Sequence, residues 1–510
     1  MNSSVATVEA ARSLAKVGNR QLLIGGKLCA PSGGDTMDVV SPVDGRPLGV
    51  VAKACRVDVY AAVDAAKRAF ETWRWTDVDE RRRCLLALAD HLRRDSAVYS
   101  ALDAIDSGSP LAVMKRDVEF AAASIEFVAG LAWSWTGTQV PTGTRAIDFT
   151  VREPYGVVAR VVPFNHPLAF AAGKIAAPLL TGNTVVLKLA DQASLSGLRL
   201  CDALVELFPP GVINVISGVG AEAGDALVRH PDVGRIGFIG SRATGKAILR
   251  AAADTVTPVT LELGGKNAFI VCADANLGEA VDAAINGMNF GTAGQSCGSF
   301  SRLFVHQELY DEAISRLAER IADVRVRNPF DESAQMGALI SDGARERCEG
   351  YIETAREGGA RLVAGGRRLT GKAFGGGYYL EPVLLADVTA DMPVATEEVF
   401  GPVLAAMPWS TVDEVIAGSN GTPYGLTAGV WCRDLDLAMR LVEDLEVGTV
   451  SVNGNGTQHH TWGAPFGGYK ESGYGKEEHV GELLDWTREK NVNVQLHEAD
   501  EGHLLRTSDT

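Results

Sequence analysis

Short runs of β-branched and aliphatic residues recur through the middle of the chain, separated by segments with helical spacing of apolar positions. The runs occupy residues 157–162, 184–187, 212–216, 235–239 and 259–261. Segments such as 193–208 and 221–230 lie between them and have the length of helices. Strands that alternate with helices indicate βαβ units and a parallel sheet covered on both faces. The pattern therefore predicts an α/β fold whose ligands bind where the strands end.

The flanking regions predict further helices and a second unit. One amphipathic helix begins near Asp58, and another follows Asp77, which has the character of an N-cap. After the five strands, alternation begins again with apolar runs at 268–272 and 301–306 around a further helix. We interpret this renewed alternation as a second α/β domain.

Two extended segments do not fit either unit. Residues 138–153 are polar and rich in Thr, with a turn at Pro141, and this predicts a hairpin that leaves the first domain. Residues 491–495 have a similar extended character. We expect these two segments to be strands that could pair across subunits.

Composition and charge narrow the class of protein. The chain of 510 residues is too long for one compact core, and its 46% hydrophobic content is that of a globular protein. A formal net charge of −16 argues against nucleic-acid or anionic-membrane partners, and no apolar run could span a bilayer. The eight Cys form no CxxC pair, and the N-terminus has no apolar signal run. A cytoplasmic protein without a metal site is expected.

Three residues could carry covalent chemistry. Cys297 has small neighbours in the segment GQSCG, which leave room for a substrate beside a nucleophile, although an inert buried Cys is the alternative. Glu262, between two Leu residues, would have a raised pKa suited to a general base, or would pair with Lys266. Asn165 follows the first strand, where its amide could donate to an oxyanion or simply form a turn.

A second group of residues suits a nucleotide. Gly240 and Ser241 follow a strand and begin a helix, an arrangement that directs backbone N–H groups at a phosphate. Lys188 and Asp191 follow another strand, where they could contact ribose hydroxyls or lie in a solvated strand end. The GxGxxG fingerprint is absent after the earlier strands, so these residues alone do not identify the cofactor.

Taken together, these motifs resemble the aldehyde dehydrogenase superfamily over about residues 20–495. The matching segments follow the family's order along the chain: PFNHPL (163–168), NTVVLKLAD (183–191), GVINVISG (211–218), FIGSRATG (238–245), LELGGK (261–266), GQSC (294–297), EEVFGPV (397–403) and PFGGYKESGYGKE (465–477).

The resemblance implies an α/β fold class with two α/β domains, parallel-rich sheets and a β-hairpin oligomerisation arm. The NAD-binding Rossmann-like domain would comprise residues 1–136 and 154–263, and the catalytic domain residues 264–464. The arm would comprise residues 137–153 and 482–498, and residues 465–481 would return the chain to the active site. The resemblance also implies a homodimer or homotetramer in which the arm completes a neighbour's sheet.

The resemblance implies roles for the reacting residues. Cys297 would be the nucleophile and Glu262 the general base, and Asn165 would form the oxyanion hole together with the Cys297 N–H. Lys174 and Glu477 match a proton-relay pair. The implied reaction oxidises an aldehyde to a carboxylic acid through a thiohemiacetal and a thioester on Cys297, with hydride transfer to the nicotinamide.

The implied cofactor contacts run from the adenosine ribose through the pyrophosphate to the nicotinamide ribose: Lys188 and Asp191, then Gly240 and Ser241, then Glu398 with Phe400 and Phe164. Because the Asp191 carboxylate would repel a 2′-phosphate, NAD is expected in preference to NADP.

The positions that line the family's substrate tunnel are mostly uncharged in this chain: His166, Phe170, Gly173, Ser296, Gly298, His460, Trp462 and Phe466. Without Arg or Lys, the tunnel offers no obvious partner for a second carboxylate, so a hydrophobic or aromatic aldehyde is expected. Betaine aldehyde is the alternative, because aromatic rings also hold quaternary ammonium groups. Phe164 and His166 stand where the family commonly has Trp and Phe.

Three other functions share this framework. A non-redox thiol esterase would need only Cys297 and Glu262, but it would not explain the cofactor residues. A CoA-acylating dehydrogenase would typically lack the base, whereas Glu262 is present. A non-catalytic binding or structural protein on the same fold would be expected to lose Cys297, Glu262 or Asn165, and all three are present.

Overall fold

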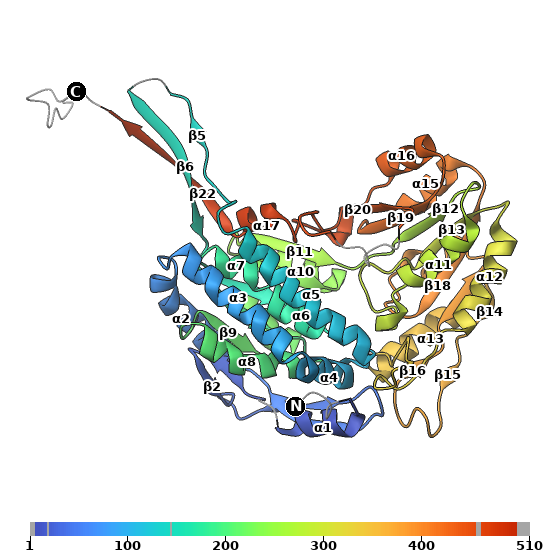
Figure 1. Ribbon diagram of the computed structural model, residues 1–510, viewed down its shortest axis with the longest axis horizontal. Coiled ribbons are helices and arrows are strands. Elements are labelled where there is room, and N and C mark those ends of the chain that lie inside the picture. Colours follow the sequence, from blue (N-terminus) through green and yellow to red (C-terminus); the bar gives the residue numbers. More distant parts are fainter. Residues whose placement is uncertain (1–5, 18–19, 143–144, 455–460, 497–510) are drawn as a thin grey trace, which may run out of the picture.

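Two α/β units and a projecting sheet make up the molecule (Figure 1). The computed structural model describes residues 6–17, 20–142, 145–454 and 461–496. The first unit contains an eight-stranded sheet and the second a seven-stranded sheet. The projecting sheet has three strands and extends away from the first unit.

The centre of the first sheet consists of the five parallel strands that the sequence predicts. In sheet order they are β9 (Ile213–Ile216), β8 (Thr184–Lys188), β7 (Val157–Val161), β10 (Val233–Gly240) and β11 (Val259–Leu263). Antiparallel strands complete the two edges: β1 (Leu22–Ile24) with β2 (Lys27–Cys29) beside β9, and β21 (Gly473–Tyr474) beside β11. The sheet therefore combines the middle of the chain with segments from near both ends.

Helices cover both faces of this sheet because successive side chains of a strand point to opposite faces. Val158 and Val185 pack in one buried cluster, whereas Val157 and Ala159 pack in another. The helices on the first of these faces are α3 (Val78–Arg94), α4 (Ser96–Ser107), α5 (Leu111–Gly130), α6 (Pro167–Gly173), α7 (Ala176–Leu180) and α8 (Leu195–Leu207). Those on the opposite face are α2 (Arg56–Trp73), α9 (Asp225–Val228) and α10 (Arg242–Ala253).

Local capping decides where the first predicted helices begin. Asp77 accepts a hydrogen bond from the backbone N–H of Asp79 at 2.8 Å, which confirms it as the N-cap of α3. The helix expected near Asp58 begins two residues earlier, because the Asp58 carboxylate accepts from the Cys55 N–H and caps α2. The single helix predicted for 221–230 is wrong: a π-helical turn, with a glycine at each end, precedes the short α9.

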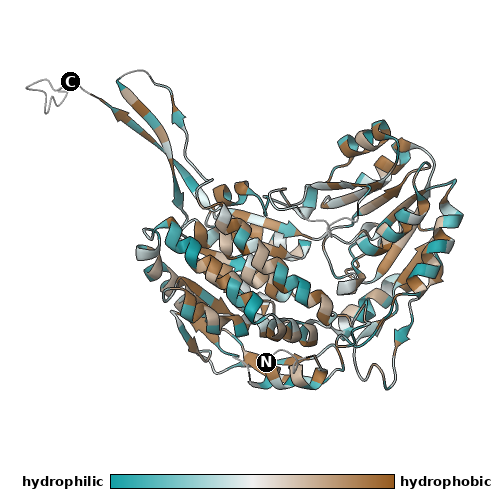
Figure 2. Ribbon diagram, in the orientation of Figure 1, coloured by the Kyte–Doolittle hydropathy of each residue, from teal (hydrophilic) through white to brown (hydrophobic). Residues whose placement is uncertain are grey.

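The second sheet confirms the second predicted α/β unit. Its strand order is β14 (Arg361–Ala364), β17 (Val383–Ala386), β18 (Val403–Trp409), β13 (Arg302–His306), β12 (Ala268–Val271), β19 (Thr427–Trp431) and β20 (Thr449–Val452), parallel throughout except at β14. Its helices are α11 (Leu277–Gly287), α12 (Tyr310–Ala322), α13 (Asp342–Glu357), α14 (Pro393–Thr396), α15 (Val412–Asn420) and α16 (Leu435–Asp444). In Figure 2, hydrophobic residues follow the strands and hydrophilic residues follow the outer helices. Within the described ranges, no helix has the length and apolar character needed to cross a membrane.

The projecting sheet is formed by one chain. It contains β5 (Gln139–Val140), β6 (Ala146–Pro154) and β22 (Thr487–Gln495), and β6 pairs with β22 antiparallel along its whole length. The expected late strand is thus longer than 491–495, and its pairing with the hairpin is intramolecular rather than across subunits. This follows from α17 (Val480–Asp485), which packs beside α7 and directs the chain along β6.

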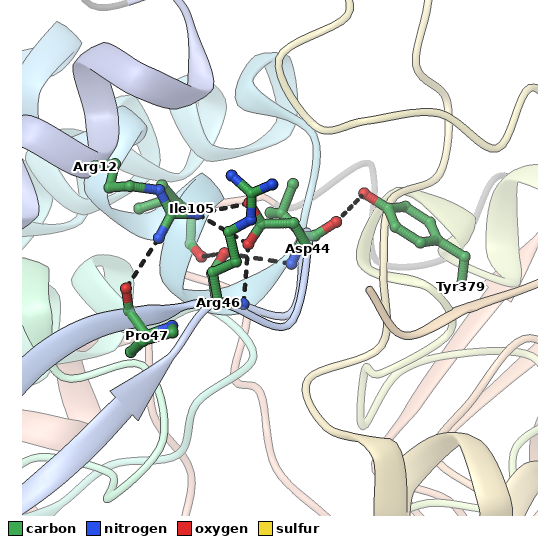
Figure 3. A network of polar contacts seen from close by, with 8 residues as sticks. Arg12, Asp44, Arg46, Pro47, Ile105 and Tyr379 are labelled. Carbon is green, nitrogen blue, oxygen red and sulfur yellow. Dashed lines mark hydrogen bonds and ion pairs between the residues drawn. The ribbon is translucent and has the colours of Figure 1, made fainter. Parts of the chain in front are cut away.

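The N-terminal segment connects the two units through polar contacts (Figure 3). Arg12 binds both carboxylate oxygens of Asp44, at 2.6 and 2.8 Å, and the carbonyl of Pro47 at 3.0 Å. The buried Tyr379 of the second unit donates to the Val43 carbonyl at 3.1 Å. The elements concerned are α1 (Val8–Val17), β3 (Thr36–Val40), β4 (Pro47–Ala52) and the hairpin of β15 (Arg368–Leu369) and β16 (Tyr379–Leu380).

Candidate active site

Cys297 lies in an irregular loop of the second unit, between α11 and β13. Left-handed backbone at Ala293 (φ 53°) and Gly294 (φ 69°) turns the chain sharply. A Cβ on Gly294 would overlap the Gly401 carbonyl, so only glycine permits this close approach. The Asn267 side chain donates to the Cys297 carbonyl at 2.7 Å. These contacts hold the loop while the Cys297 side chain stays partly accessible.

Glu262 approaches Cys297 from the first unit. It lies on β11, between β10 and β21, and is only 6% exposed. Its carboxyl interacts with the Cys297 thiol by charge and by hydrogen bonding. Burial raises the pKa of Glu262 to about 7, and the hydrogen bond to Cys297 opposes that rise. The alternative ion pair is absent, because the buried Lys266 ammonium has no hydrogen-bond partner within the described chain.

The surroundings of Cys297 keep its thiol protonated near neutral pH. Burial raises the pKa of Cys297 well above its ordinary value, and the negative charge and hydrogen bond of Glu262 add to this effect. Glu398 and Glu478 contribute further negative charge. A nucleophilic thiolate therefore requires a nearby proton acceptor, and Glu262 is in place to be one.

Asn165 lies in the turn that joins β7 to α6. Its side chain is buried, yet its Oδ1 has no hydrogen-bond partner among the residues described. Buried amides are normally satisfied by the fold. The turn therefore does not account for the burial of Asn165, and its Oδ1 is left without the hydrogen bond that a turn would supply.

Lys174 and Glu477 meet in a buried network of charges. The Lys174 ammonium lies 2.8 Å from Glu477 Oε2 and 2.9 Å from Glu478 Oε1. Arg160, on β7, donates to Glu477 Oε1 at 2.8 Å. Burial favours the neutral form of Glu477, but the charges of Arg160 and Lys174 outweigh it and lower its pKa. Glu482 accepts from the Glu478 N–H at 2.7 Å, and burial raises the pKa of Glu482 to about 7.

The sequence indicated only two members of this network. Arg160 interrupts an otherwise apolar strand, and a buried cation of this kind requires a carboxylate partner. That signal could have been recognised from the sequence. Its partner could not, because Glu477 is more than 300 residues further along the chain.

The network predicts a large stability effect. Replacing Glu477 by Gln leaves Arg160 without its carboxylate in the core, and should lower the free energy of unfolding by about 3–5 kcal/mol. Chemical denaturation monitored by circular dichroism measures this change. Asp232→Asn, which removes the exposed partner of Lys67, is the control and should have little effect. Equal effects of the two variants would contradict a stabilising role for the buried network.

The predicted ribose and phosphate residues lie at the carboxyl ends of β8 and β10, the two strands that flank β7 in the sheet. Ser241 is the N-cap of α10, and its Oγ accepts from the Thr244 N–H at 3.3 Å. Lys188 ends β8 and is buried, so desolvation lowers its pKa while the Asp191 charge opposes this. Asp191 itself is exposed. Gly240, the last residue of β10, directly precedes the exposed first turn of the helix.

The residues predicted beside the nicotinamide lie together. Glu398 Oε1 accepts from the Gly265 N–H at 3.0 Å, and burial raises the pKa of Glu398 to about 7. A Cβ on Gly264 would overlap the Glu398 carboxylate. Phe400 and Phe164 meet edge to face, with ring centroids 5.8 Å apart. With the exposed helix N-terminus and Asp191, this donor and acceptor set fits a dinucleotide.

Several of the predicted substrate residues form two separate sets of contacts, one around His166 and one around Trp462. His166 Nδ1 lies 2.7 Å from Asp117 Oδ2, and its ring meets Phe170 edge to face. Trp462 stacks on Phe127 and also contacts Phe120, with centroid distances of 5.6 and 5.0 Å. Asp117, Phe120 and Phe127 all belong to α5, which the sequence analysis did not single out. Their spacing along one helix face was the available signal.

The remaining predicted lining residues have ordinary surroundings. Gly173 is buried, and a Cβ there would make a normal contact with Ser124 at 3.5 Å. Ser296 Oγ accepts from the Asn289 side chain at 3.4 Å. Phe466 forms an isolated backbone bridge with Glu477. Gly298 is buried, and His460 lies outside the described residues.

Comparison with known proteins agrees with this architecture. A model of the aldehyde dehydrogenase family matches residues 29–492. The aldehyde dehydrogenase tropH of Talaromyces stipitatus is 41% identical over 485 residues, covering 94% of each chain. The betaine aldehyde dehydrogenase of Staphylococcus aureus, solved with NAD+, superposes with a TM-score of 0.93 and is 31% identical. The match covers 98% of this chain and 99% of that one. The indole-3-acetaldehyde dehydrogenase of P. syringae, solved with NAD+ and IAA, superposes with a TM-score of 0.92 and is 32% identical. The match covers 96% of this chain and 100% of that one.

The chain belongs to the aldehyde dehydrogenase family. It is an oxidoreductase that acts on aldehydes with a nicotinamide cofactor, and its fold class is confirmed as that of the family.

Proposed function

We propose that this enzyme uses NAD to oxidise a hydrophobic or aromatic aldehyde to the carboxylic acid, through a covalent bond to Cys297. The observation that carries the proposal is the buried Glu262 carboxyl beside the partly accessible Cys297 thiol. A nucleophile and a base with a pKa near neutrality are the pair that acyl transfer requires.

The residues act in two stages. Glu262 accepts the thiol proton, and the Cys297 thiolate attacks the carbonyl carbon while the Asn165 amide donates to the oxyanion. The nicotinamide, when bound, supplies the hydride acceptor. In the second stage Glu262 takes a proton from a water molecule, which then hydrolyses the thioester on Cys297. Glu262 Oε1 has no hydrogen-bond partner within the described ranges, which leaves it available to that water.

The buried charge network lies near enough to Glu262 to act on its ionisation. Charges on Glu477, Lys174 and Glu478 all influence the ionisation of Glu262. We assign Lys174 and Glu477 to a relay that carries the proton away between the two stages. The direct contact of Lys174 with both Glu477 and Glu478 supports this assignment.

Cofactor binding is assigned to the first unit, residues 1–136 with 154–263, and catalysis to residues 264–464. Lys188 and Asp191 would hold the adenosine ribose, Gly240 and Ser241 the pyrophosphate, and Glu398 the nicotinamide ribose, beside Phe400 and Phe164. The exposed carboxylate of Asp191 supports NAD rather than NADP, because it would repel a 2′-phosphate.

The cofactor assignment predicts a change of preference in Asp191→Ser. The wild-type enzyme should favour NAD over NADP, and the variant should raise the NADP-to-NAD ratio of kcat/KM about tenfold or more, because a repulsive charge is removed. Initial rates with each cofactor measure the ratio. Asp254→Ser, at an exposed Asp beyond the end of α10, is the control. Comparable use of both cofactors by the wild-type enzyme would contradict the assignment.

The aromatic residues around the predicted tunnel position Trp462 support an apolar substrate. Trp462 stacks on Phe127 and also contacts Phe120, so each of these rings covers part of the face of another. This favours an aromatic aldehyde over betaine aldehyde, because a quaternary ammonium group binds on free ring faces.

Substrate class is tested by NADH formation with benzaldehyde, a medium-chain aliphatic aldehyde, betaine aldehyde and succinic semialdehyde. The aromatic or aliphatic aldehyde should have the highest kcat/KM. A clear preference for betaine aldehyde would overturn the apolar assignment.

We also propose that the enzyme is a homodimer or homotetramer assembled through the arm, residues 137–153 and 482–498. Val140, Ile147 and Val494 are exposed on this thin sheet in the single chain, and exposed apolar side chains favour burial by a partner. Light scattering of the purified protein should give two or four times the chain mass.

A further inference from the structure

His166 is held by a carboxylate at the wall of the predicted substrate tunnel. Its Nδ1 lies 2.7 Å from Asp117 Oδ2. Within the described residues, the His166 ring makes this one hydrogen bond. Because a carboxylate only accepts hydrogen bonds, Nδ1 carries a proton and Nε2 is the nitrogen left for another partner. The side chain of His166 is 25% exposed, so this nitrogen is not sealed in the core.

Packing fixes the direction of the imidazole. Phe170, one turn further along α6, meets the ring edge to face with centroids 5.5 Å apart. Asp117 projects from α5, which packs against α6. The ring is thus held by one hydrogen bond and one aromatic contact, and the His–Asp arrangement presets its protonation at Nδ1.

The charges around His166 determine which substituent it could bind. Asp117, Asp103 and Glu262 all act on the charge of His166. A second carboxylate on the substrate would therefore enter a region that already holds several acidic groups. A neutral oxygen would not meet this repulsion. A hydroxyl group can accept from Nε2–H of the imidazolium and can donate to Nε2 of the neutral ring, so it bonds in both states.

The same face of α5 continues as an aromatic wall. Phe120 lies one turn after Asp117, and Phe127 follows two turns later, with Trp462 packed on both. A flat aromatic substrate could contact this wall while one of its substituents reaches the imidazole.

We propose, building on the aromatic-aldehyde oxidation proposed above, that His166 binds a hydroxyl substituent on the ring of the aldehyde and that Asp117 positions His166 to do so. His166 is the specificity-determining residue, and Asp117 is a positioning residue. The substrate class is thereby narrowed from aromatic aldehydes to hydroxylated aromatic aldehydes.

The test compares substituents rather than absolute rates. NADH formation is measured with benzaldehyde, the three hydroxybenzaldehydes, the matching methoxybenzaldehydes and 4-formylbenzoate. In the wild-type enzyme, one hydroxy isomer should exceed benzaldehyde in kcat/KM by about tenfold to hundredfold. Its methoxy analogue should gain less because it cannot donate, and 4-formylbenzoate should be the poorest of the series.

Variants separate specificity from folding. His166→Phe keeps an aromatic ring and removes the hydrogen bond, so the hydroxy-to-parent ratio of kcat/KM should fall to near one. Asp117→Asn should lower the ratio part of the way, because the ring is no longer paired with a carboxylate. Glu119→Gln removes a carboxylate from the exposed side of the same helix, where Glu119 binds Arg93, and should leave the ratio unchanged.

A binding measurement covers the case in which a variant is poorly active. In the Cys297→Ala background, tryptophan fluorescence titration should give tighter binding of the hydroxy isomer than of benzaldehyde, and His166→Phe should remove that difference. A ratio near one in the wild-type enzyme, or an unchanged ratio in His166→Phe, would overturn the role of His166. Oxidation of a medium-chain aliphatic aldehyde but of no aromatic aldehyde would overturn the role of His166 alone, whereas failure to oxidise either kind would overturn the proposed function.

Discussion

Replacing Cys297 by Ala should reduce aldehyde-dependent NADH formation by a factor on the order of 10⁵, because no other group can form the covalent intermediate. The neighbouring loop should keep its shape, since Asn267 holds it through the Cys297 carbonyl, a contact that the substitution leaves in place. Binding of NAD should therefore persist in the variant. Steady-state absorbance at saturating benzaldehyde and calorimetric titration with NAD measure the two quantities.

A matched control for this variant is Cys84→Ala. Cys84 is a half-buried Cys on α3, remote in the chain from the Cys297 loop, and its loss should leave the rate nearly unchanged. If Cys297→Ala retained more than about a tenth of the wild-type rate, covalent catalysis at this residue would be refuted.

Replacing Glu262 by Gln should lower kcat by roughly 10³-fold, because both the thiol and the hydrolytic water lose their proton acceptor. The wild-type rate should rise with pH through about 7: burial raises the pKa of Glu262 to about 7, and only the deprotonated carboxylate is a base. Below that pH the rate should fall by about tenfold per unit. Initial rates from pH 5.5 to 9 measure this dependence.

The Gln variant should lose the rise near pH 7, because its amide does not titrate. Glu349→Gln is the control, since it removes a surface carboxylate paired with Arg368 and should leave the profile intact. An unchanged rise in Glu262→Gln would assign the titration to another group, and Glu262 would then not be the base.

The overall fold could be predicted because its strands are recognisable locally. Buried parallel strands need apolar side chains on both faces, so β7, β8 and β10 appear as mainly apolar runs that each contain one basic residue. The predicted ends of the five central strands lie within two residues of those observed. Shorter elements lack such a pattern: β21 has two residues, and its pairing with β11 depends on a partner more than 200 residues away.

The candidate site was only partly predictable. Cys297, Glu262 and Asn165 stand out because each is a reactive or polar residue in an unusual local setting. Asp117 and Phe120 do not, because an Asp and a Phe on an amphipathic helix are ordinary until a neighbouring helix is placed against them. Their importance depends on the packing of α5 against α6, which sets a carboxylate beside His166.

The sequence alone determined the α/β class, the order of the strands along the chain and the positions of the reactive side chains. These properties depend on local composition and periodicity. Only the tertiary structure decided which groups interact, as Glu262 shows: its sequence neighbour Lys266 makes no ion pair with it, whereas Cys297 of the other unit contacts it. Side chains on adjacent strand residues point to different places, and charges and hydrogen bonds act over a few ångströms of space rather than along the chain.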